Sequence, residues 1–188
     1  MKDMVKIGSR LAIICAVAAL VLGLMNAVTE PRIELIKQQR LAAALENVSS
    51  GMKVGEANPV EGHKGITTYY PLFESSDTSD DPDAYIVRLV GTGYGGDMVI
   101  LAGFQATGEV FAVQLMENQE TPGLGKEAEK SSYMEMYLGT GGEEPIPVRK
   151  DMLAQEEADT ITGATITFIG IAKALENGSN FVKELGGI

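Results

Sequence analysis

The chain has 188 residues, of which 45% are hydrophobic and 22% are charged, and its formal net charge is −11. This composition excludes a disordered chain, because there is enough apolar surface for a core, and the length allows one ordinary domain plus an appendage. The acidic balance and the absence of a Lys/Arg-rich stripe exclude a nucleic-acid-binding protein.

Cysteine and histidine occur once each, as Cys15 and His63. A single cysteine excludes an internal disulfide framework and any site in this chain that needs several thiolates, such as an iron–sulfur cluster. His63 lies in the loop-like stretch EGHKG, which is typical of a solvated surface histidine. The acidic stretch 74–83 lacks the glycine and the distal glutamate of a calcium loop. We therefore expect no metal centre.

The first predicted element is a membrane helix at residues 11–28, after a short tail at residues 1–10. This run of 18 residues carries no charge, and its length is sufficient to cross a bilayer. The alternative is a cleaved signal peptide, but the bulky Met25 stands where a cleavage site needs a small residue. Ile13 and Ile14 likewise argue against lipid attachment at Cys15. We therefore expect an uncleaved anchor.

The orientation of this anchor depends on the charges around it. Three basic residues stand on each side, so the positive-inside rule barely discriminates: Lys2, Lys6 and Arg10 precede the span, and Arg32, Lys37 and Arg40 follow it. The short tail favours a cytoplasmic amino terminus, which places the body of the chain outside the cytoplasm. Beyond residue 10 there are 12 basic and 25 acidic residues, a net charge of −13, so this body should not bind an anionic membrane surface.

A juxtamembrane helix and a loop are predicted at residues 29–64. Thr29 and Pro31 are typical of a helix start, and apolar residues follow at helical spacing as far as Leu45. Residues 49–64 contain glycine, proline and polar residues without a clear period, which predicts a loop. The remaining residues, 65–188, are predicted to form the extracytoplasmic domain.

Four runs in this domain are rich in β-branched and aromatic residues and predict strands. They are ITTYYPLF (66–73), which Pro71 interrupts, AYIVRLVGTG (84–93), DMVILAGFQ (97–105) and EVFAVQLMEN (109–118). A short connection containing Gly108 favours an antiparallel hairpin between the last two. The connection GTGYGGD (91–97) is glycine-rich, but it lacks the lysine and the following helix of a phosphate-binding loop, so a turn is the stronger interpretation.

After these strands, the stretch ETPGLG (120–125) combines proline with two glycines and predicts a turn that another group can approach closely. A helical stretch is expected around 127–130, followed by Gly-rich and Pro-rich residues at 139–147. Apolar residues at helical spacing from Thr165 to Leu175 predict a further helix, which Asn177 and Gly178 should end or kink. Strands together with packing helices indicate an α+β domain with a mainly antiparallel sheet.

The stretch DTITGATIT (159–167) leads into this last helix and contains four threonines. The first amides of a helix lack internal partners and the helix dipole favours negative charge, so a phosphate could bind here. The simpler alternative is that the threonine hydroxyls cap the helix.

The pattern Asp159-x-x-Thr162-Gly163-Ala164-Thr165-x-Thr167 resembles the acceptor motif of proteins that carry covalent FMN. Together with GYGG (93–96) and ETPGLG in the same order, it makes the chain similar to the G subunit of the Rnf ion-translocating ferredoxin:NAD oxidoreductase complex. The resemblance spans the whole chain and is strongest from about residue 85 to 175. The C subunit of the sodium-pumping NADH:quinone oxidoreductase shares the acceptor motif but usually has a longer extracytoplasmic region.

This resemblance implies that Thr167 carries FMN through a phosphoester, which a separate flavin transferase installs with FAD as the donor. The implied recognition element for the transferase comprises Asp159, Thr162, Gly163, Ala164, Thr165 and Thr167. The residues implied to contact the cofactor are Tyr94, Thr121, Gly123, Leu124, Gly125, Thr162, Gly163, Ala164 and Thr165.

The resemblance further implies an electron-transfer subunit in a cell membrane complex that moves ions, held by one membrane helix. Such a subunit passes electrons between redox centres of its partner subunits and has no substrate of its own. An alternative of a different class is a membrane-anchored binding module without redox chemistry, in which the threonines only cap a helix.

Overall fold

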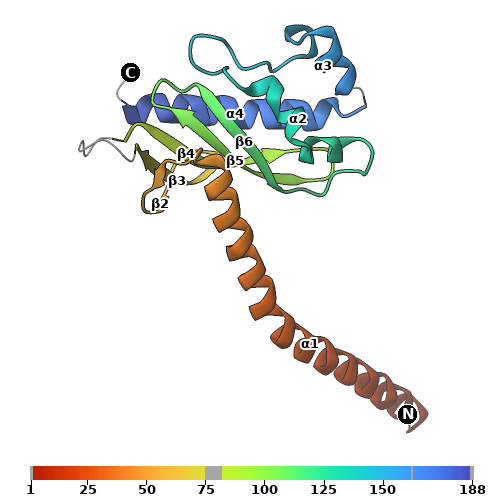
Figure 1. The fold of residues 1–188 in the computed structure, drawn as a ribbon. Helices are drawn as coiled ribbons and strands as arrows, with labels where there is room; N and C mark the ends of the chain where they lie inside the picture. Colours follow the sequence, from red (N-terminus) through yellow and green to blue (C-terminus); the bar gives the residue numbers. More distant parts are fainter. Residues whose placement is uncertain (1, 75–81, 162, 187–188) are drawn as a thin grey trace. The chain divides into compact units, whose positions relative to one another are not determined.

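The computed structural model describes residues 2–74, 82–161 and 163–186. The chain divides into two compact units, Met1–Leu41 and Ala42–Ile188. Helix α1 (Lys2–Val48) forms the first unit and continues into the second (Figure 1). Most of the acidic stretch 74–83 and Thr162 of the acceptor motif lie outside the described residues.

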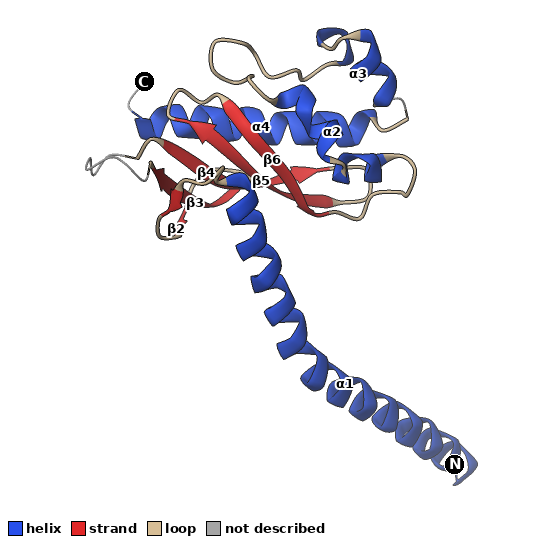
Figure 2. Cartoon of the chain, in the orientation of Figure 1, coloured by secondary structure: helices blue, strands red, loops and turns tan. Residues whose placement is uncertain are grey.

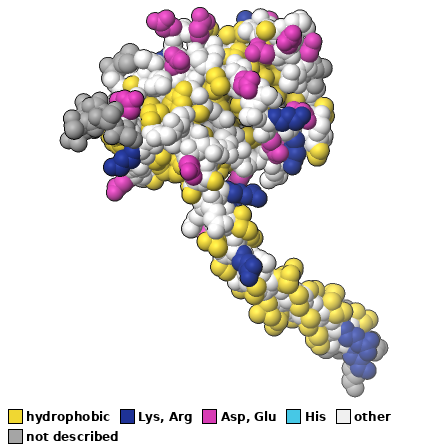
Figure 3. All heavy atoms as spheres, in the orientation of Figure 1, with side chains coloured by type: hydrophobic (Ala, Val, Ile, Leu, Met, Phe, Trp, Pro, Cys, Tyr) yellow, Lys and Arg dark blue, Asp and Glu magenta, His cyan; other side chains and the backbone are white. Residues whose placement is uncertain are grey.

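Helix α1 contains an uncharged apolar stretch at residues 11–28, with charged residues before and after it. Its side chains from residue 6 to residue 40 are all exposed. Figure 3 shows hydrophobic side chains along this helix, with Lys and Arg near its amino-terminal end. Within the part of the chain that the structure describes, this is the one helix that is long and apolar enough to cross a membrane.

Helix α1 runs through Thr29 and Pro31 without interruption. The hydroxyl of Thr29 donates to the carbonyl oxygen of Met25 at 2.9 Å, so it does not cap a new helix. Pro31 lacks an N–H and costs about 3 kcal/mol inside a helix. The hydrogen bonds of a helix this long outweigh that penalty, and the anchor and the juxtamembrane helix are therefore one continuous element.

The second unit is built on an antiparallel sheet, which within the described residues has six strands in the order β1-β3-β4-β5-β6, with β2 also paired to β3 (Figure 2). The strands are β1 (Lys53–Val54), β2 (Asn58–Pro59), β3 (Ile66–Phe73), β4 (Ala84–Thr92), β5 (Asp97–Gln105) and β6 (Val110–Glu117). The four longer strands confirm the prediction. The loop predicted over residues 49–64 was wrong in part, because β1 and β2 lie within it and are too short to show a period.

Strand β3 is continuous, although Pro71 was expected to interrupt it. Pro71 lies opposite Tyr85 of β4, and its carbonyl oxygen accepts a hydrogen bond from the backbone N–H of Gly55 at 2.8 Å. Since the N–H and C=O of a strand residue point to the same side, the missing donor of Pro71 faces the short strands and not β4. The main ladder of the sheet therefore loses no hydrogen bond.

Two hairpins connect the central strands. In the first, Thr92 pairs with Asp97, and the backbone N–H of Gly93 donates to the carbonyl oxygen of Gly96 at 2.8 Å. The second joins β5 to β6 in the predicted antiparallel arrangement. The turn expected at GTGYGGD is thus confirmed.

Short helices follow the sheet, and one long helix covers it. They are η1 (Gly125–Glu129), α2 (Ser131–Met134), η2 (Glu135–Tyr137), η3 (Lys150–Met152), α3 (Gln155–Thr160) and α4 (Thr165–Gly186). The helix end expected at Gly178 was wrong, because α4 continues to Gly186. Gly178 instead allows close packing, since a Cβ atom there would lie 2.7 Å from Cζ of Phe104.

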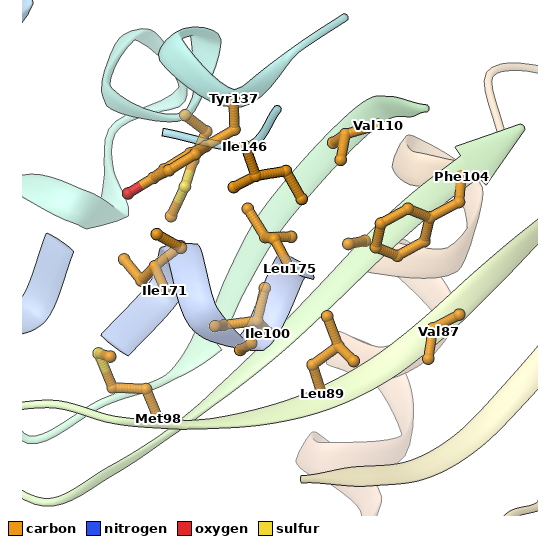
Figure 4. Packing of buried hydrophobic residues seen from close by; sticks show 14 of the residues in the cluster. Val87, Leu89, Met98, Ile100, Phe104, Val110, Tyr137, Ile146, Ile171 and Leu175 are labelled. Atoms are coloured by element: carbon orange, nitrogen blue, oxygen red, sulfur yellow. The ribbon is translucent and has the colours of Figure 1, made fainter. Parts of the chain in front are cut away.

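The core lies between α4 and one face of the sheet. Figure 4 shows Leu89 and Ile100 of the sheet facing Ile171 and Leu175 of α4. All four side chains are fully buried. Strands and helices thus share one core, which confirms the α+β fold class.

The start of α4 touches the end of β4 through backbone atoms. A Cβ atom at Gly170 would lie 2.2 Å from the carbonyl oxygen of Thr92, and one at Gly91 would lie 2.8 Å from the carbonyl oxygen of Gly170. Neither backbone can move away without disturbing the core. This contact fixes where α4 begins relative to the turn after β4.

We expect Gly170→Ala to destabilise the protein by about 1–3 kcal/mol, the usual cost of overpacking, although alanine favours helix by about 1 kcal/mol. Urea unfolding of the full chain in detergent measures this difference. Gly8→Ala is the matched control, because a Cβ atom at that helical glycine meets no atom within 4 Å. An unchanged unfolding midpoint for Gly170→Ala would contradict the backbone contact.

Candidate functional site

A cavity of about 360 Å³ lies where the β4–β5 turn, the loop after β6 and the start of α4 meet. Its volume is in the range of small-molecule sites. The residues that line it are Tyr94, Glu120, Thr121, Leu124, Gly125, Gly163, Ala164, Thr165, Ile166 and Thr167. The three motifs GYGG, ETPGLG and DTITGATIT, which are far apart in the sequence, therefore form one site.

The carboxylate of Glu120 holds these three segments together. Oγ1 of Thr167 donates to Oε2 of Glu120 at 2.6 Å, and the backbone N–H of Gly95 donates to Oε1 at 2.8 Å. Glu120 is 3% exposed and Thr167 is 1% exposed. A buried carboxylate needs such donors, because an unpaired charge in the interior is strongly unfavourable.

Glycines allow the backbone to approach Glu120. A Cβ atom at Gly93 would lie 2.2 Å from Oε1 of Glu120, and one at Gly125 would lie 2.3 Å from Oε2. A Cβ atom at Gly95 would lie 2.1 Å from the carbonyl oxygen of Gln119. Two of these glycines belong to GYGG and one to ETPGLG, so the two glycine-rich segments are shaped by their packing around Glu120 as well as by their turns.

Apolar side chains surround the mouth of the cavity. Leu124 is 45% exposed, Ile166 is 54% exposed and Tyr94 is 76% exposed. Gly163 brings the acceptor motif close to Leu124, since a Cβ atom at Gly163 would lie 3.0 Å from Cδ2 of Leu124. Apolar and aromatic groups around a polar centre are typical of a site that binds a planar organic ring.

The charge in this cavity comes from Glu120 and from the helix start. Among the residues that the structure describes, none that lines the cavity is Lys or Arg. An anion in the cavity would instead rely on the free amides and the dipole at the amino-terminal end of α4. The hydroxyl of Thr167 points to Glu120, so helix capping does not account for this threonine.

Eight of the residues expected to contact a cofactor or to serve as its attachment point line the cavity: Tyr94, Thr121, Leu124, Gly125, Gly163, Ala164, Thr165 and Thr167. Gly123 does not line it, but its φ of +77° supports the turn. Asp159 lies outside the cavity on the exposed side of α3, where it accepts a hydrogen bond from Nε2 of Gln155 at 3.0 Å. Thr162 lies outside the described residues.

Glu120 and Ile166 are the lining residues that the sequence reasoning missed. The signal for Glu120 was an acidic residue immediately before a glycine-rich loop, directly after a strand. Nothing in the sequence shows that its carboxylate is buried against Thr167, because this contact joins residues 47 positions apart. Ile166 carries no signal beyond its place in the acceptor motif.

Tyr133 of α2 places a second buried polar group close to Glu120. Its hydroxyl is buried and has no hydrogen-bond partner among the described residues. Burial, together with the negative charge of Glu120, raises the pKa of Tyr133 well above its ordinary value. The hydroxyl is therefore neutral in the folded chain at neutral pH.

The raised pKa of Tyr133 predicts a loss of stability at alkaline pH. Tyrosine in the unfolded chain titrates near pH 10, so the stability linked to the neutral hydroxyl is fully present below this pH and is lost as the pH rises above it. Tyr133→Phe should therefore reduce the loss of unfolding free energy at alkaline pH. Part of that loss should remain, because burial also raises the pKa of Tyr137. Tyr133→Phe should also stabilise the chain by about 1 kcal/mol at neutral pH, because it removes a buried hydroxyl that has no hydrogen-bond partner among the described residues.

Unfolding free energies of the full chain between pH 7 and about pH 11 measure both effects. Tyr94→Phe is the matched control, because Tyr94 is 76% exposed. Equal pH profiles for Tyr133→Phe and the wild type would contradict a buried neutral hydroxyl at this position.

Comparison with known proteins defines the class to which this fold and site belong. Residues 93–180 match the model of the FMN-binding domain family, and this range includes the whole cavity. The site is therefore that of an FMN-binding domain.

Relatives that extend over nearly the whole chain specify the family. The G subunit of the ion-translocating oxidoreductase complex of Vibrio vulnificus is 31% identical, over 94% of this chain and 88% of the relative. The G subunit of the Na⁺-translocating ferredoxin:NAD⁺ oxidoreductase complex of Acetobacterium woodii is 29% identical, over 95% of this chain and 89% of the relative. The G subunit of the proton-translocating ferredoxin:NAD⁺ oxidoreductase complex of Clostridium ljungdahlii is 25% identical, over 90% of this chain and 86% of the relative. The chain belongs to the family of G subunits of ion-translocating oxidoreductase complexes, which confirms the resemblance drawn from the motifs.

Proposed function

We propose that Thr167 carries FMN as a phosphoester and that the chain relays electrons through this flavin within a membrane-bound ion-translocating oxidoreductase complex. The observation that supports this most strongly is the position of Thr167. Its hydroxyl lies at the start of α4, inside a cavity of the FMN-binding domain, and is aligned by a buried carboxylate. The relatives are named as subunits of oxidoreductase complexes, which supports the relay.

The charges around the cavity favour a covalent bond over reversible binding. A free FMN phosphate carries close to two negative charges and is usually held by cationic side chains, yet the described lining of the cavity has no Lys or Arg and contains the carboxylate of Glu120. A phosphodiester carries one negative charge, and a covalent bond retains the cofactor without a cation. The backbone N–H groups at the start of α4 can then donate hydrogen bonds to the phosphate oxygens that carry the remaining charge.

The other lining residues fit the rest of the cofactor. Leu124 and Ile166 offer apolar surface at the mouth of the cavity, and Tyr94 offers an aromatic face. Gly125 lines the cavity, and a Cβ atom there would lie 2.8 Å from Oγ1 of Thr167, so the glycine leaves the attachment point unobstructed. When bound, FMN supplies one- and two-electron transfer chemistry, whereas the chain supplies position and electrostatics.

A separate flavin transferase would attach the FMN moiety of FAD to Thr167 and release AMP. Its recognition element would comprise Asp159, Thr162, Gly163, Ala164, Thr165 and Thr167. Asp159 is exposed, as is Thr165, so another protein can reach both. Thr167 itself is reached through the cavity.

We further propose that α1 anchors the chain in the cell membrane with residues 11–28 in the bilayer. Residues 1–10 would then lie in the cytoplasm, and residues 29–64 would connect the anchor to an extracytoplasmic FMN-binding domain at 65–188. A covalent bond is advantageous there, because a flavin that dissociates outside the cytoplasm is lost.

Intact-mass analysis of the full chain tests the proposal. The chain is incubated with an active flavin transferase and FAD, then denatured, and its mass is compared with that of untreated chain. We expect an added mass of one FMN less water that survives denaturation. If the transferase modifies another acceptor protein in the same assay but leaves this chain unmodified, the proposal fails.

A further inference from the structure

The structure assigns a role to Glu120 that goes beyond holding loops together. We infer that Glu120 is a catalytic residue for the modification of its own chain and accepts the proton of Thr167 when this hydroxyl is esterified. The inference rests on the proposed covalent attachment of FMN. It identifies which group removes the proton from the attachment point.

The geometry is that of a nucleophile and its general base. Oγ1 of Thr167 donates to Oε2 of Glu120 at 2.6 Å, within the distance at which a base takes up a proton directly. The second carboxylate oxygen is held by the backbone N–H of Gly95. The carboxylate is therefore fixed in position before any reaction begins.

Burial strengthens this interaction. The side chains of Glu120 and Thr167 are almost inaccessible to solvent, yet both line the cavity. A carboxylate in such a position has few competing donors, and its charge acts on the hydroxyl with little screening. Tyr133 is the neighbouring titratable group that responds to this charge, and its hydroxyl stays neutral, so it does not compete as a base.

The step can be written with every bond accounted for. Oγ1 of Thr167 forms a bond to the phosphorus on the riboflavin side of a flavin dinucleotide, as the O–H bond of Thr167 breaks and its proton passes to Oε2 of Glu120. The phosphoanhydride bond breaks at the same phosphorus, and AMP leaves with the electron pair of that bond. No oxidant or reductant takes part.

A purely structural role for Glu120 makes a different prediction. As a structural link, the carboxylate would need only to bond to Gly95 and Thr167, and glutamine can do both. The amide oxygen of Glu120→Gln accepts from Gly95, and its NH₂ group donates to Oγ1 of Thr167. Glutamine thus keeps the link but cannot accept a proton, so it separates the two roles.

The experiment measures kcat and KM for attachment of FMN to the full chain, with a flavin transferase and FAD and with intact mass as the readout. Glu120→Gln should lower kcat by about 100-fold or more, as expected for loss of a general base, with little change in KM for the chain. Glu120→Asp retains a carboxylate and should recover part of the rate. Glu117→Gln is the matched control, because Glu117 is exposed at the end of β6 and does not line the cavity.

The outcomes separate this inference from the proposed function. If the wild type is modified and Glu120→Gln is modified at the same rate, the base belongs to the transferase and the inference is overturned, while covalent attachment stands. Absence of an adduct on the wild type overturns both. Thermal unfolding is recorded for each variant. If Glu120→Gln does not fold, Glu120→Asp is used for the test instead. A kcat for Glu120→Asp equal to that of the wild type overturns the inference, and a lowered kcat supports it.

Discussion

Thr167→Ala is expected to abolish covalent attachment of FMN, whereas Thr165→Ala, which removes only part of the proposed recognition element, is expected to slow attachment without moving it from Thr167. Thr167 lies with its hydroxyl inside the cavity and bonded to Glu120, while the side chain of Thr165 is exposed. Under the proposed attachment, only Thr167 acts as the nucleophile, because its hydroxyl donates to the carboxylate of Glu120. Intact mass after denaturation, followed by peptide mapping, measures the attachment and its position.

Stability must be controlled in this experiment. Thr167→Ala removes a hydrogen bond to a buried carboxylate, which should lower the unfolding free energy by about 1.5–3 kcal/mol. Thr167→Ser keeps the hydroxyl and should keep the adduct, so it distinguishes loss of the nucleophile from loss of a methyl group. An adduct of equal yield on Thr167→Ala, mapped to another residue, would refute Thr167 as the attachment point.

Phe168→Ala is expected to destabilise the second unit by about 3–5 kcal/mol. Phe168 is fully buried in the first turn of α4, and its ring stacks on that of Tyr137 with centroids 5.8 Å apart. The hydroxyl of Tyr137 also donates to the carbonyl oxygen of Phe168 at 3.2 Å. Removing the ring of Phe168 leaves a cavity in the core directly beneath the helical turn that carries Thr167.

Chemical denaturation of the full chain in detergent measures this loss. Ile166→Ala is the matched control on the same helical turn, because Ile166 is 54% exposed and surface substitutions usually change stability by less than about 0.5 kcal/mol. Similar midpoints for the two variants would show that the start of α4 is not held by the core.

Several elements of the fold could be predicted because their signals are local. The four longer strands alternate or cluster β-branched and aromatic residues, and the hairpin turns carry glycine, so a short window of sequence is sufficient. The boundaries of α1 and α4 could not be predicted in the same way. Pro31 and Gly178 are typical helix breakers, but one lies in a very long helix and the other packs beneath Phe104.

The candidate site divides in a similar way. The sequence identifies Thr167 and the glycine-rich loops through motifs, and eight of the expected residues line one cavity. It does not identify Glu120 as their common partner. Motifs show which residue types recur together, whereas the hydrogen bonds between Glu120, Gly95 and Thr167 depend on three loops meeting in space.

The sequence by itself determined the class of the protein: it contains an apolar amino-terminal helix, an acidic α+β domain and a motif that resembles the acceptor motif of covalent flavin proteins. These properties depend on composition, periodicity and short motifs, which are present before the chain folds. Only the tertiary structure decided that the hydroxyl of Thr167 faces a buried carboxylate and that the described lining of this cavity lacks a cationic side chain. Both facts arise from contacts between distant segments, and the chemistry of a buried group is set by what surrounds it.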